Sequence, residues 1–454
     1  MITQKQMTHV WPDDTHRNER GEIVVGGVSL VEIAETYGTP VYVYDEATLR
    51  KAMRQFREAF VQRLPLCRVV YAGKAFLTTA LVRLLVEEDL GLDVVSAGEL
   101  YVGLSAGMDP SRISLHGNNK TRDELRMALD AGIGKIIVDN FDEIEDLETL
   151  CADREEPMTV LLRVNPGVDV HTHKKISTGM ADSKFGLPIA DGQAARAVER
   201  LRSMPGVHLA GYHAHVGSQL FEADASVDAI EEILDFAVDM RARYGVEMEQ
   251  LSPGGGFGIA YLDHENPPAV EDWADRLASA VIDGCRERGI PMPVVVIEPG
   301  RAIAGPAGVA VYRVGARKEL PGVRTYVSVD GGMADNIRPA LYDAAYTASI
   351  ANRSGDAVTE RVTIAGKYCE SGDILIEEIE LPRLERDDLL AIPAAGAYCL
   401  AMASNYNMSL RPAVVMVSNG EANVIRRRET FDDLLRLEND AVSISDAASD
   451  THRA

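Results

Sequence analysis

Short apolar runs rich in β-branched residues recur between residues 67 and 297, and amphipathic stretches of helical period separate them. The runs have the length of strands, and the stretches have the length of helices. The pattern predicts strands at Cys67–Ala72, Leu92–Val95, Arg112–Leu115, Lys135–Val138, Thr159–Val164, Val207–Ala214, Glu249–Leu251 and Pro293–Ile297. It predicts helices at Thr78–Glu88, Ala97–Ala106, Arg122–Ala131, Asp142–Cys151, Ala190–Met204, Ser226–Tyr244 and Ala269–Arg288.

Alternating strands and helices are typical of parallel strand pairing with helical crossovers. About eight strands over roughly 240 residues fit a closed barrel better than an open sheet. We therefore predict an α/β fold in which residues 45–308 form a (β/α)8 barrel of the TIM type.

A different pattern begins after Gly305. Short strand-like runs alternate with turns there, which predicts a mostly antiparallel β domain over residues 309–428. The N-terminal segment, residues 1–44, has strand-like runs at Ile23–Val25, Val28 and Val41–Tyr44, and we expect it to join the same sheet. The acidic tail, residues 429–454, is expected to hold a terminal helix and a frayed end.

Composition and charge narrow the possible functions. The chain has 454 residues, with 46 Lys and Arg against 70 Asp and Glu, so its net charge is −24. A field of that sign argues against binding to nucleic acid or to an anionic membrane surface. Neither a membrane-spanning run of about 20 apolar residues nor a secretory leader is recognisable. The five cysteines form no CxxC pair, so we expect a reducing, cytoplasmic location.

Polar or glycine-rich residues follow nearly every predicted barrel strand. In such barrels the loops at the carboxyl ends of the strands converge on one face, which is where the chemistry occurs. The common location therefore predicts a single site, to which these residues contribute: Lys74, Asp93, Ser96, His116, Asn118, Asn119, Asp139, Arg163, Asn165, His213, His215, Gly254–Gly256 and Glu298.

Lys74 and Glu298 each allow two interpretations. Lys74, in YAGKAF, is either a solvated loop lysine or a partly desolvated one, whose lowered pKa would permit Schiff-base chemistry. Glu298, in EPGR, ends an apolar strand, where an unpaired carboxylate is rare. It either forms a structural ion pair with Arg301 or faces the cationic ring nitrogen of a pyridoxal cofactor.

The glycine run at 253–258, PGGGFG, is neither a dinucleotide fingerprint nor a P-loop. A flexible turn is one interpretation. Three glycines after a barrel strand favour instead a nest of backbone N–H groups that holds one phosphate. Ser218, in HVGSQ, would add a hydroxyl donor.

His213 and His215 are two residues apart on a predicted strand and therefore face the same way. His171 and His173 repeat this spacing in a predicted loop. HxH is a zinc-ligand spacing, so a metal-dependent hydrolase is a competing hypothesis. Such barrels usually carry HxH on the first strand, whereas here it is on the sixth. We therefore favour one histidine stacked on a flat cofactor, one structural histidine and no metal.

A series of long motifs connects these residues in order. They are HGNNK at 116–120, RVNPGVDVHTHKKISTGMADSKFG at 163–186, HAHVGSQ at 213–219, GGGFG at 254–258, EPGRAIAGPAG at 298–308, DGGMADNIRPALYDA at 330–344, GKYCESGDIL at 366–375 and AGAY at 395–398. With them, the chain resembles the fold-type III, alanine-racemase-like, pyridoxal-phosphate decarboxylases from about Val41 to Val417. Among these it is most similar to the branch that decarboxylates meso-diaminopimelate at its D-centre to give L-lysine, the last step of lysine synthesis.

The resemblance implies a role for each site residue. Lys74 would carry pyridoxal 5'-phosphate as a Schiff base, His215 would stack on the pyridine ring, and Glu298 would pair with the ring nitrogen. Its phosphate would be held by Ser218, Gly255, Gly256, Gly300, Arg301 and Tyr398. The distal part of the substrate would be bound by Arg301, Arg338, Tyr342, Glu370 and Tyr398. Cys369 would help to protonate the product.

In this family the residues at Cys369 and Glu370 reach into the site of a partner subunit, so the resemblance also implies a homodimer with shared sites. Two arginines suit a substrate with a second carboxylate, because a buried guanidinium pair without an anion is costly. Other diamine-acid decarboxylases, racemases and non-catalytic pyridoxal-phosphate carriers agree less well with the 163–186 block, RPALY at 338–342 and the β domain. Near the lysine, Gly73 and Phe76 depart from the family pattern.

Overall fold

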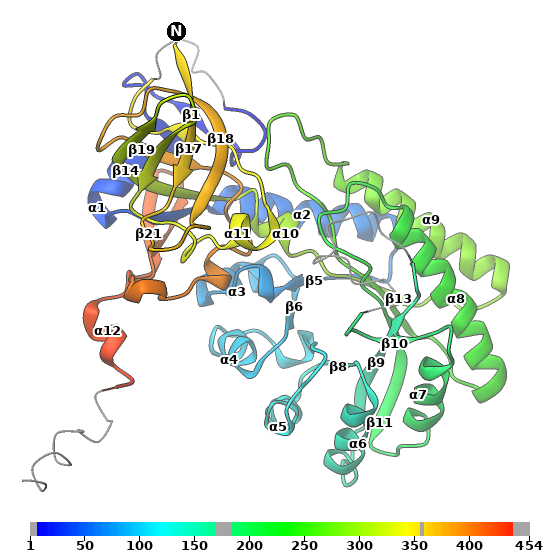
Figure 1. Cartoon of the computed structure of the whole chain (residues 1–454). Helices are drawn as coiled ribbons and strands as arrows, with labels where there is room; N and C mark the ends of the chain where they lie inside the picture. The colour runs from blue at the N-terminus through cyan, green and yellow to red at the C-terminus, as the bar shows by residue number, and fades with distance from the viewer. Residues whose placement is uncertain (1–6, 169–182, 355–357, 439–454) are drawn as a thin grey trace, which may run out of the picture.

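The computed structural model describes residues 7–168, 183–354 and 358–438, in which a barrel is joined to a β domain (Figure 1). Eight parallel strands form the barrel, and pairing of the last strand with the first closes it. The eight are β5 (Cys67–Ala72), β6 (Gly91–Val94), β7 (Ile113–Leu115), β8 (Lys135–Val138), β9 (Met158–Asn165), β11 (Val207–His213), β12 (Gln250–Gly254) and β13 (Val294–Ile297). The predicted barrel fold is confirmed. A short extra strand, β10 (Leu187–Pro188), pairs with the carboxyl-terminal end of β9, at Val164 and Asn165.

Helices surround the barrel (Figure 1), and local sequence determines where several of them begin. Thr78, Ser96, Thr121 and Asn140 each accept a hydrogen bond from the backbone N–H three residues further on. Such N-caps satisfy free amides of the first helical turn, so each helix starts close to the end of the preceding strand. The barrel helices are α3 (Thr79–Glu87), α4 (Ala97–Ser105), α5 (Arg122–Ala131), α6 (Phe141–Leu150), α7 (Gln193–Leu201), α8 (Asp224–Tyr244) and α9 (Val270–Arg288).

The β domain is built on a nine-stranded sheet that is mostly antiparallel. Its strands are β4 (Val41–Asp45), β14 (Gly308–Leu320), β15 (Arg324–Val329), β16 (Ser349–Ile350), β17 (Thr359–Ala365), β18 (Ile374–Pro382), β19 (Leu389–Ile392), β20 (Ala413–Ser418) and β21 (Glu421–Arg426). Two pairings are parallel, β4 with β20 and β15 with β17. β4 lies between β14 and β20, so a strand that precedes the barrel is central to the domain that follows it.

The first strands of the chain do not join that sheet, contrary to our expectation. β1 (His16–Arg17), β2 (Ile23–Val25) and β3 (Val28–Ser29) form a separate three-stranded sheet. Gly26 and Gly27 both have positive φ and make the tight turn that pairs β2 with β3. Apolar side chains of this small sheet still pack with those of β4, β14 and β20 in one core. Packing of side chains, together with isolated backbone hydrogen bonds such as that from the Ile23 N–H to the Ala351 carbonyl, therefore attaches this segment to the β domain without a strand ladder.

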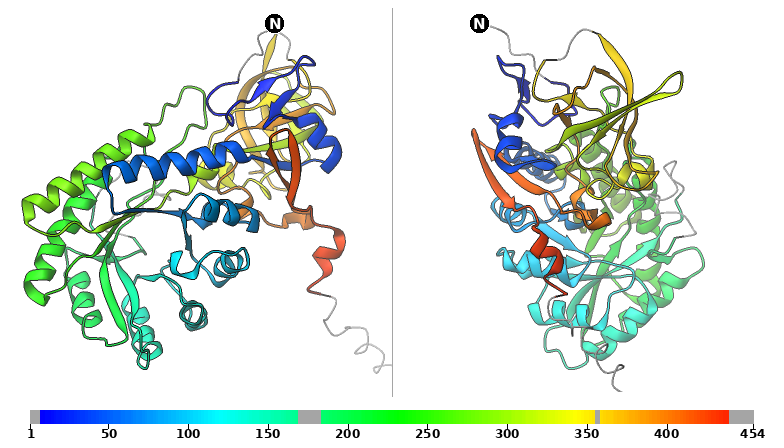
Figure 2. Two further views of the ribbon diagram at one scale, coloured as in Figure 1. Left: turned by 180° about the vertical axis from the view of Figure 1, so that it is seen from behind. Right: turned by 60° about the vertical axis from the view of Figure 1, so that its left-hand side comes forward.

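Two helices near the N-terminus were not predicted, α1 (Leu30–Tyr37) and α2 (Glu46–Arg63). α2 buries Leu49, Met53, Phe56 and Phe60 on one face, so its sequence carries a helical period that the prediction overlooked. The helix runs from the β domain along the barrel towards α9 (Figure 2).

At the other end of the chain, α12 (Phe431–Leu435) is the terminal helix predicted for the acidic tail. It projects away from the body of the molecule (Figure 1). The end predicted to be frayed, from residue 439 onward, lies outside the described residues. In the described part of the chain, no helix combines the length and the apolar character needed to cross a membrane.

Candidate active site

A pocket of about 640 Å³ lies at the carboxyl ends of the barrel strands. Residues of the β domain complete it, among them those of α11 (Arg338–Tyr342). Most of the predicted site residues line this pocket: Lys74, His215, Ser218, Gly255, Gly256, Glu298, Gly300, Arg301, Arg338, Tyr342 and Tyr398. Cys369 and Glu370 do not.

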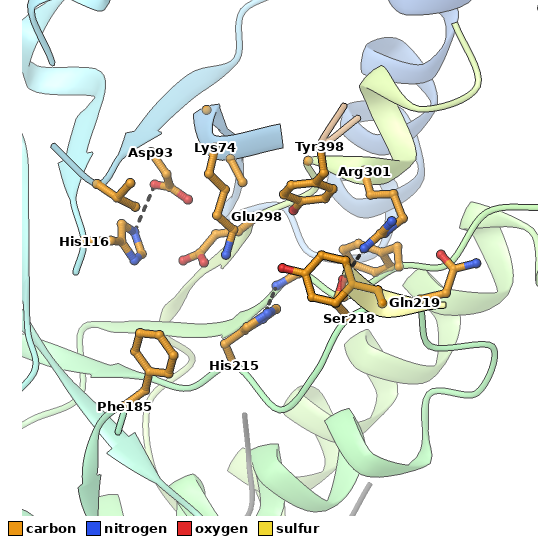
Figure 3. A pocket seen from close by; sticks show the side chains of 18 of the residues that line it. Lys74, Asp93, His116, Phe185, His215, Ser218, Gln219, Glu298, Arg301 and Tyr398 are labelled. Carbon is orange, nitrogen blue, oxygen red and sulfur yellow. Dashed lines mark hydrogen bonds and ion pairs between the residues drawn. The ribbon is translucent and has the colours of Figure 1, made fainter. Parts of the chain in front are cut away.

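Lys74 lies in η1 (Gly73–Ala75), a single turn that follows β5, and its side chain points into the pocket (Figure 3). The residue is exposed, so of our two interpretations the chain shows the solvated lysine and not the partly desolvated one. Gly73 has no room for a side chain, because a Cβ there would lie 2.8 Å from the Asp93 carbonyl oxygen. Phe76 is buried and stacks on Tyr44 with ring centroids 4.2 Å apart. Both departures from the family pattern are therefore accommodated by tight packing around the lysine turn.

Glu298 follows β13 and presents a carboxylate to the pocket. Ser252 Oγ donates a 2.6 Å hydrogen bond to its Oε1, and its Oε2 lies 3.1 Å from His213 Nε2. Burial alone would raise the pKa of Glu298, but the nearby histidines and these two hydrogen bonds lower it below its ordinary value. Among the described residues Arg301 forms no ion pair with Glu298, so that alternative was wrong. The carboxylate is ionised at neutral pH and can face a cation.

Asp93 and His116 extend this polar cluster (Figure 3). His116 Nε2 lies 3.2 Å from Asp93 Oδ1, and the rings of His116 and His213 meet edge to face at 5.1 Å. Burial and the negative charge of Glu298 raise the pKa of Asp93 well above its ordinary value. Burial lowers the pKa of His116 to about 4. At neutral pH the cluster's negative charge therefore resides on Glu298.

Three side chains of this polar cluster lie close enough together to bear on the zinc hypothesis. Donor atoms of His116, His213 and Glu298 lie within 4.8 Å of one another, as a metal cluster would require. His215 does not belong to that group, so the HxH pair does not act as one bidentate unit. His171 and His173 lie outside the described residues.

The glycine run lies against the loops that carry His215 and Glu298. A Cβ on Gly255 would overlap the Glu298 carbonyl oxygen, and one on Gly256 would lie 2.6 Å from the Gly217 carbonyl oxygen. The amide of Gly255 donates to His215 Nδ1 at 3.3 Å, and that of Gly254 to Ser252 Oγ at 3.1 Å. The nest of three free amides that we predicted is thus reduced, because two of the three are bonded within the protein.

Arg301 begins the short helix α10 (Arg301–Ala304), and its guanidinium joins two hydroxyl groups. Nη1 donates to Tyr261 Oη at 2.5 Å, and Nη2 donates to Ser218 Oγ at 3.0 Å (Figure 3). The group also lies over the ring of Tyr398, 4.8 Å from its centroid. Tyr398 donates its backbone N–H to the Ala75 carbonyl at 2.8 Å, which connects the β domain to the lysine turn.

Arg338 is buried at the start of α11 and donates a short hydrogen bond to the hydroxyl of Tyr346. Its guanidinium lies 4.5 Å from the ring centroid of Tyr261. Among the described residues, neither Arg338 nor Arg301 forms an ion pair with a carboxylate. Because a buried cation without a counter-ion is costly, two such groups in one pocket indicate an anionic ligand.

Cys369 and Glu370 are exposed on the loop between β17 and β18, away from the pocket of their own chain. Cys369 donates its backbone N–H to Asn407 Oδ1 at 3.0 Å. Their predicted roles would therefore have to be performed in another chain.

Three residues that support the site were not predicted: Ser252, Tyr261 and Tyr346. Ser252 stands directly before the glycine run and Tyr261 three residues after it, in LSPGGGFGIAY. A serine or tyrosine in such a loop has many ordinary roles. Their importance becomes visible only where Glu298, Arg301 and Arg338 converge on them in space.

The site fits pyridoxal phosphate on the chemistry of its donors. It offers an exposed lysine amine, a largely buried ionised carboxylate suited to a pyridinium nitrogen, and a hydroxyl and a guanidinium beside the glycine run suited to a phosphate. The family model for the pyridoxal-binding domain of pyridoxal-dependent decarboxylases matches residues 46–305.

Named relatives cover nearly the whole chain. The diaminopimelate decarboxylase of Bacillus subtilis (strain 168) is 47% identical over 424 residues, which cover 93% of this chain and 97% of the relative. That of Mycobacterium tuberculosis (strain H37Rv) is 43% identical over 439 residues, covering 95% and 98%. A crystal structure of diaminopimelate decarboxylase from M. jannaschii in complex with L-lysine superimposes with a TM-score of 0.89 at 34% identity, covering 95% of this chain and 98% of that one.

Proposed function

This chain belongs to the diaminopimelate decarboxylases within the pyridoxal-dependent decarboxylase family, and we propose how its residues perform the reaction. The reaction removes carbon dioxide from the D-centre of meso-diaminopimelate and puts a proton in its place, which leaves L-lysine. One observation carries the assignment of the site. A single pocket holds a lysine amine, a largely buried ionised glutamate and two buried arginines that, among the described residues, have no carboxylate partner.

Pyridoxal phosphate, when bound, supplies an electron sink for the charge that carbon dioxide leaves behind. Lys74 would hold it through its amine, His215 would lie against the ring, and Glu298 would face the ring nitrogen. Its phosphate would be held by Ser218, Gly255, Gly256, Gly300, Arg301 and Tyr398. The Gly255 N–H lies 3.3 Å from His215 Nδ1, so it would give up this long hydrogen bond when it binds the phosphate.

Glu298 keeps its negative charge because Ser252 and His213 donate to its two oxygens. A carboxylate that stays ionised opposite the ring nitrogen keeps that nitrogen protonated, which strengthens its pull on electrons. Burial raises the pKa of Asp93 well above its ordinary value, which favours the protonated form that adds no second charge to the cluster. The cluster thus concentrates one negative charge at the position where a cation is needed.

Arg301, Arg338 and Tyr342 would bind the carboxylate of the centre that does not react. This requirement distinguishes a diamino diacid from ornithine or arginine, which lack a second carboxylate. A substrate without that group would leave two buried guanidinium groups without an anion.

A homodimer would complete the site. Cys369 and Glu370 are exposed on the β17–β18 loop, which supports their use by a neighbouring chain. Glu370 would accept the distal ammonium, and the Cys369 thiol would supply the proton that replaces the carboxylate, to be restored from water. All five cysteines are free thiols, which supports the expected cytoplasmic location.

The decisive experiment measures lysine and carbon dioxide from meso-diaminopimelate with pyridoxal phosphate present. Wild type should release the two in equal amounts, and Lys74→Ala should release neither. Lys51→Ala, a matched change of an exposed lysine, should behave as wild type. A wild type that binds cofactor but releases nothing would reject the proposed substrate.

Mixed dimers test the shared site. Lys74→Ala and Cys369→Ala are each expected to be inactive alone. After subunit exchange, some hybrid dimers would combine an intact lysine with an intact cysteine, so activity should reappear. No recovery despite demonstrated exchange would contradict the sharing of residues between subunits.

A further inference from the structure

Tyr261 lies between the two guanidinium groups of the pocket. Its hydroxyl accepts a 2.5 Å hydrogen bond from Arg301 Nη1, and its ring centroid lies 4.5 Å from the guanidinium carbon of Arg338. The ring of Tyr346 meets that of Tyr261 edge to face at 5.3 Å, and the Tyr346 hydroxyl accepts a bond from Arg338. A tyrosine that is only 5% exposed therefore contacts one arginine with its oxygen and the other with its face.

The electrostatics of this arrangement are unusual. Arg301 and Arg338 are 8% and 6% exposed, and both are charged at any working pH. Two buried like charges repel each other, and a carboxylate between them would be the usual remedy. Tyrosine compensates only in part, because a hydroxyl oxygen and an aromatic face attract cations without cancelling their charge. The cations are thereby held in place while most of their attraction for an anion is retained.

Their donors are also left available. A guanidinium has five N–H donors. Within the described residues, Arg301 uses donors only towards Tyr261 and Ser218, and Arg338 only towards Tyr346. Arg301 Nε is buried without a hydrogen-bond partner in that part of the chain. Tyr261 itself lines the pocket, so it stands where a ligand carboxylate would approach both arginines.

We propose that Tyr261 is a positioning residue that sets Arg301 and Arg338 as a preformed receptor for the distal carboxylate, and so determines the preference for a diamino diacid over a diamino monoacid. This inference rests on the proposed function, because it concerns the same pocket. Arg301 is held on one side by Ser218 and on the other by Tyr261. Without the Tyr261 hydroxyl, Ser218 would be the one hydrogen-bond partner left to the Arg301 guanidinium among the described residues, on the side where we place the phosphate.

The hydroxyl and the ring of Tyr261 are separable. Tyr261→Phe keeps the aromatic face beneath Arg338 and removes only the acceptor for Arg301. Tyr261→Leu removes both. A matched control is Tyr212→Phe, since Tyr212 is also a buried barrel tyrosine and its hydroxyl has no hydrogen-bond partner among the described residues.

The test compares substrates with and without the distal carboxylate. D-Lysine is diaminopimelate that lacks this group, and its decarboxylation gives cadaverine. In the Tyr261→Phe holoenzyme the KM for meso-diaminopimelate should rise about tenfold with kcat nearly unchanged, as for loss of a hydrogen bond to a charged group. The kcat/KM for D-lysine should stay as in wild type. Tyr261→Leu should lose more of the preference for meso-diaminopimelate over D-lysine. Tyr212→Phe should retain the wild-type preference.

Binding without turnover provides a second measurement. Calorimetric titration of the holoenzymes should show L-lysine, which has the carboxylate, binding about tenfold more weakly to Tyr261→Phe than to wild type. Cadaverine, which lacks it, should bind equally to both. Unchanged L-lysine affinity would overturn the proposal, and so would an equal loss for both ligands, which would indicate a merely structural role.

The two hypotheses fail separately. If the wild type does not release lysine from meso-diaminopimelate, the proposed function fails, while the titrations still test Tyr261. If Tyr261→Phe does not fold, Tyr346→Phe removes the acceptor of Arg338 instead and keeps its ring. Tyr346→Phe should show the same selective loss of affinity for L-lysine. An unchanged affinity for L-lysine would reject the proposal that the tyrosines preform a carboxylate receptor.

Discussion

The two ends of the pocket treat buried charge in opposite ways. Around Glu298, a hydroxyl and an imidazole each donate one hydrogen bond to a single carboxylate, and the raised pKa of the neighbouring Asp93 favours its neutral form. Around Arg301 and Arg338, tyrosines hold two cations, and no carboxylate of the described chain pairs with either. The Glu298 carboxylate would face a cofactor that stays bound, whereas Arg301 and Arg338 would bind a substrate carboxylate that leaves with the product. The protein can supply permanent hydrogen-bond donors to a charge that faces a bound cofactor. A receptor for a substrate must instead leave some of its own donors unbonded.

The largest effect is expected from removing the charge at the anionic end. Glu298→Gln keeps the shape of the side chain but cannot hold a ring nitrogen protonated, so kcat should fall about 10³-fold. The exposed Glu249→Gln is the matched control and should be neutral. Single-turnover kinetics of both variants measure the effect, and a loss below tenfold would contradict the role of Glu298.

At the cationic end, Arg338→Met replaces a buried charge by an apolar chain of similar volume. We expect kcat/KM for meso-diaminopimelate to fall about 10²-fold, mainly through KM, because a charge-assisted contact to the substrate is lost. The value for D-lysine should change little. Arg324→Met, at a half-buried arginine over Tyr326 and outside the pocket, controls for loss of an arginine on a tyrosine face. A loss carried mostly by kcat would place Arg338 in the chemical step instead.

Ser252→Ala tests the anionic end of the pocket by a smaller change, because the charge of Glu298 is kept. It removes the 2.6 Å hydrogen bond to Glu298 Oε1 and leaves the contact with His213. Loss of one hydrogen bond to a charged group should lower kcat about tenfold. The exposed Ser203→Ala, whose hydroxyl bonds only to a helix carbonyl, should show none. Steady-state rates at saturating substrate make the comparison.

The last effect concerns stability and pH, and it should leave the rate at neutral pH unchanged. The pKa of His116 is about 4 in the folded chain and about 6.5 when unfolded, so the unfolded chain binds more protons between these values. The free energy of unfolding should therefore decrease as the pH falls from 6.5 to 4, by up to about 3 kcal/mol from this residue. His116→Gln should flatten that decrease, whereas the exposed His208→Gln should not. Thermal melts at pH 7, 5.5 and 4 measure both slopes, and parallel slopes would contradict the burial argument.

The sequence predicted the barrel more accurately than the segment before it. β5, β8 and α5 begin and end at the predicted residues, because each has an apolar run or amphipathic face bounded by polar caps. The N-terminal strands have the same local signals, but their partners were not predictable. Whether Ile23–Val25 pairs with β3 or with the large sheet depends on a glycine turn and on distant surfaces.

The residue types of the site were likewise readable in order along the chain. Lys74, His215, Glu298, Arg301 and Arg338 stand in motifs that local sequence makes conspicuous, and strand ends of one barrel have to meet at one face. The sequence alone was therefore sufficient to specify the fold class, the pocket's location and most of its chemistry. Which charge pairs with which was decided only by tertiary packing. Arg301 turns to Tyr261 rather than Glu298, and Ser252 supports the carboxylate, since hydrogen bonds of a few ångströms depend on positions that no linear spacing encodes.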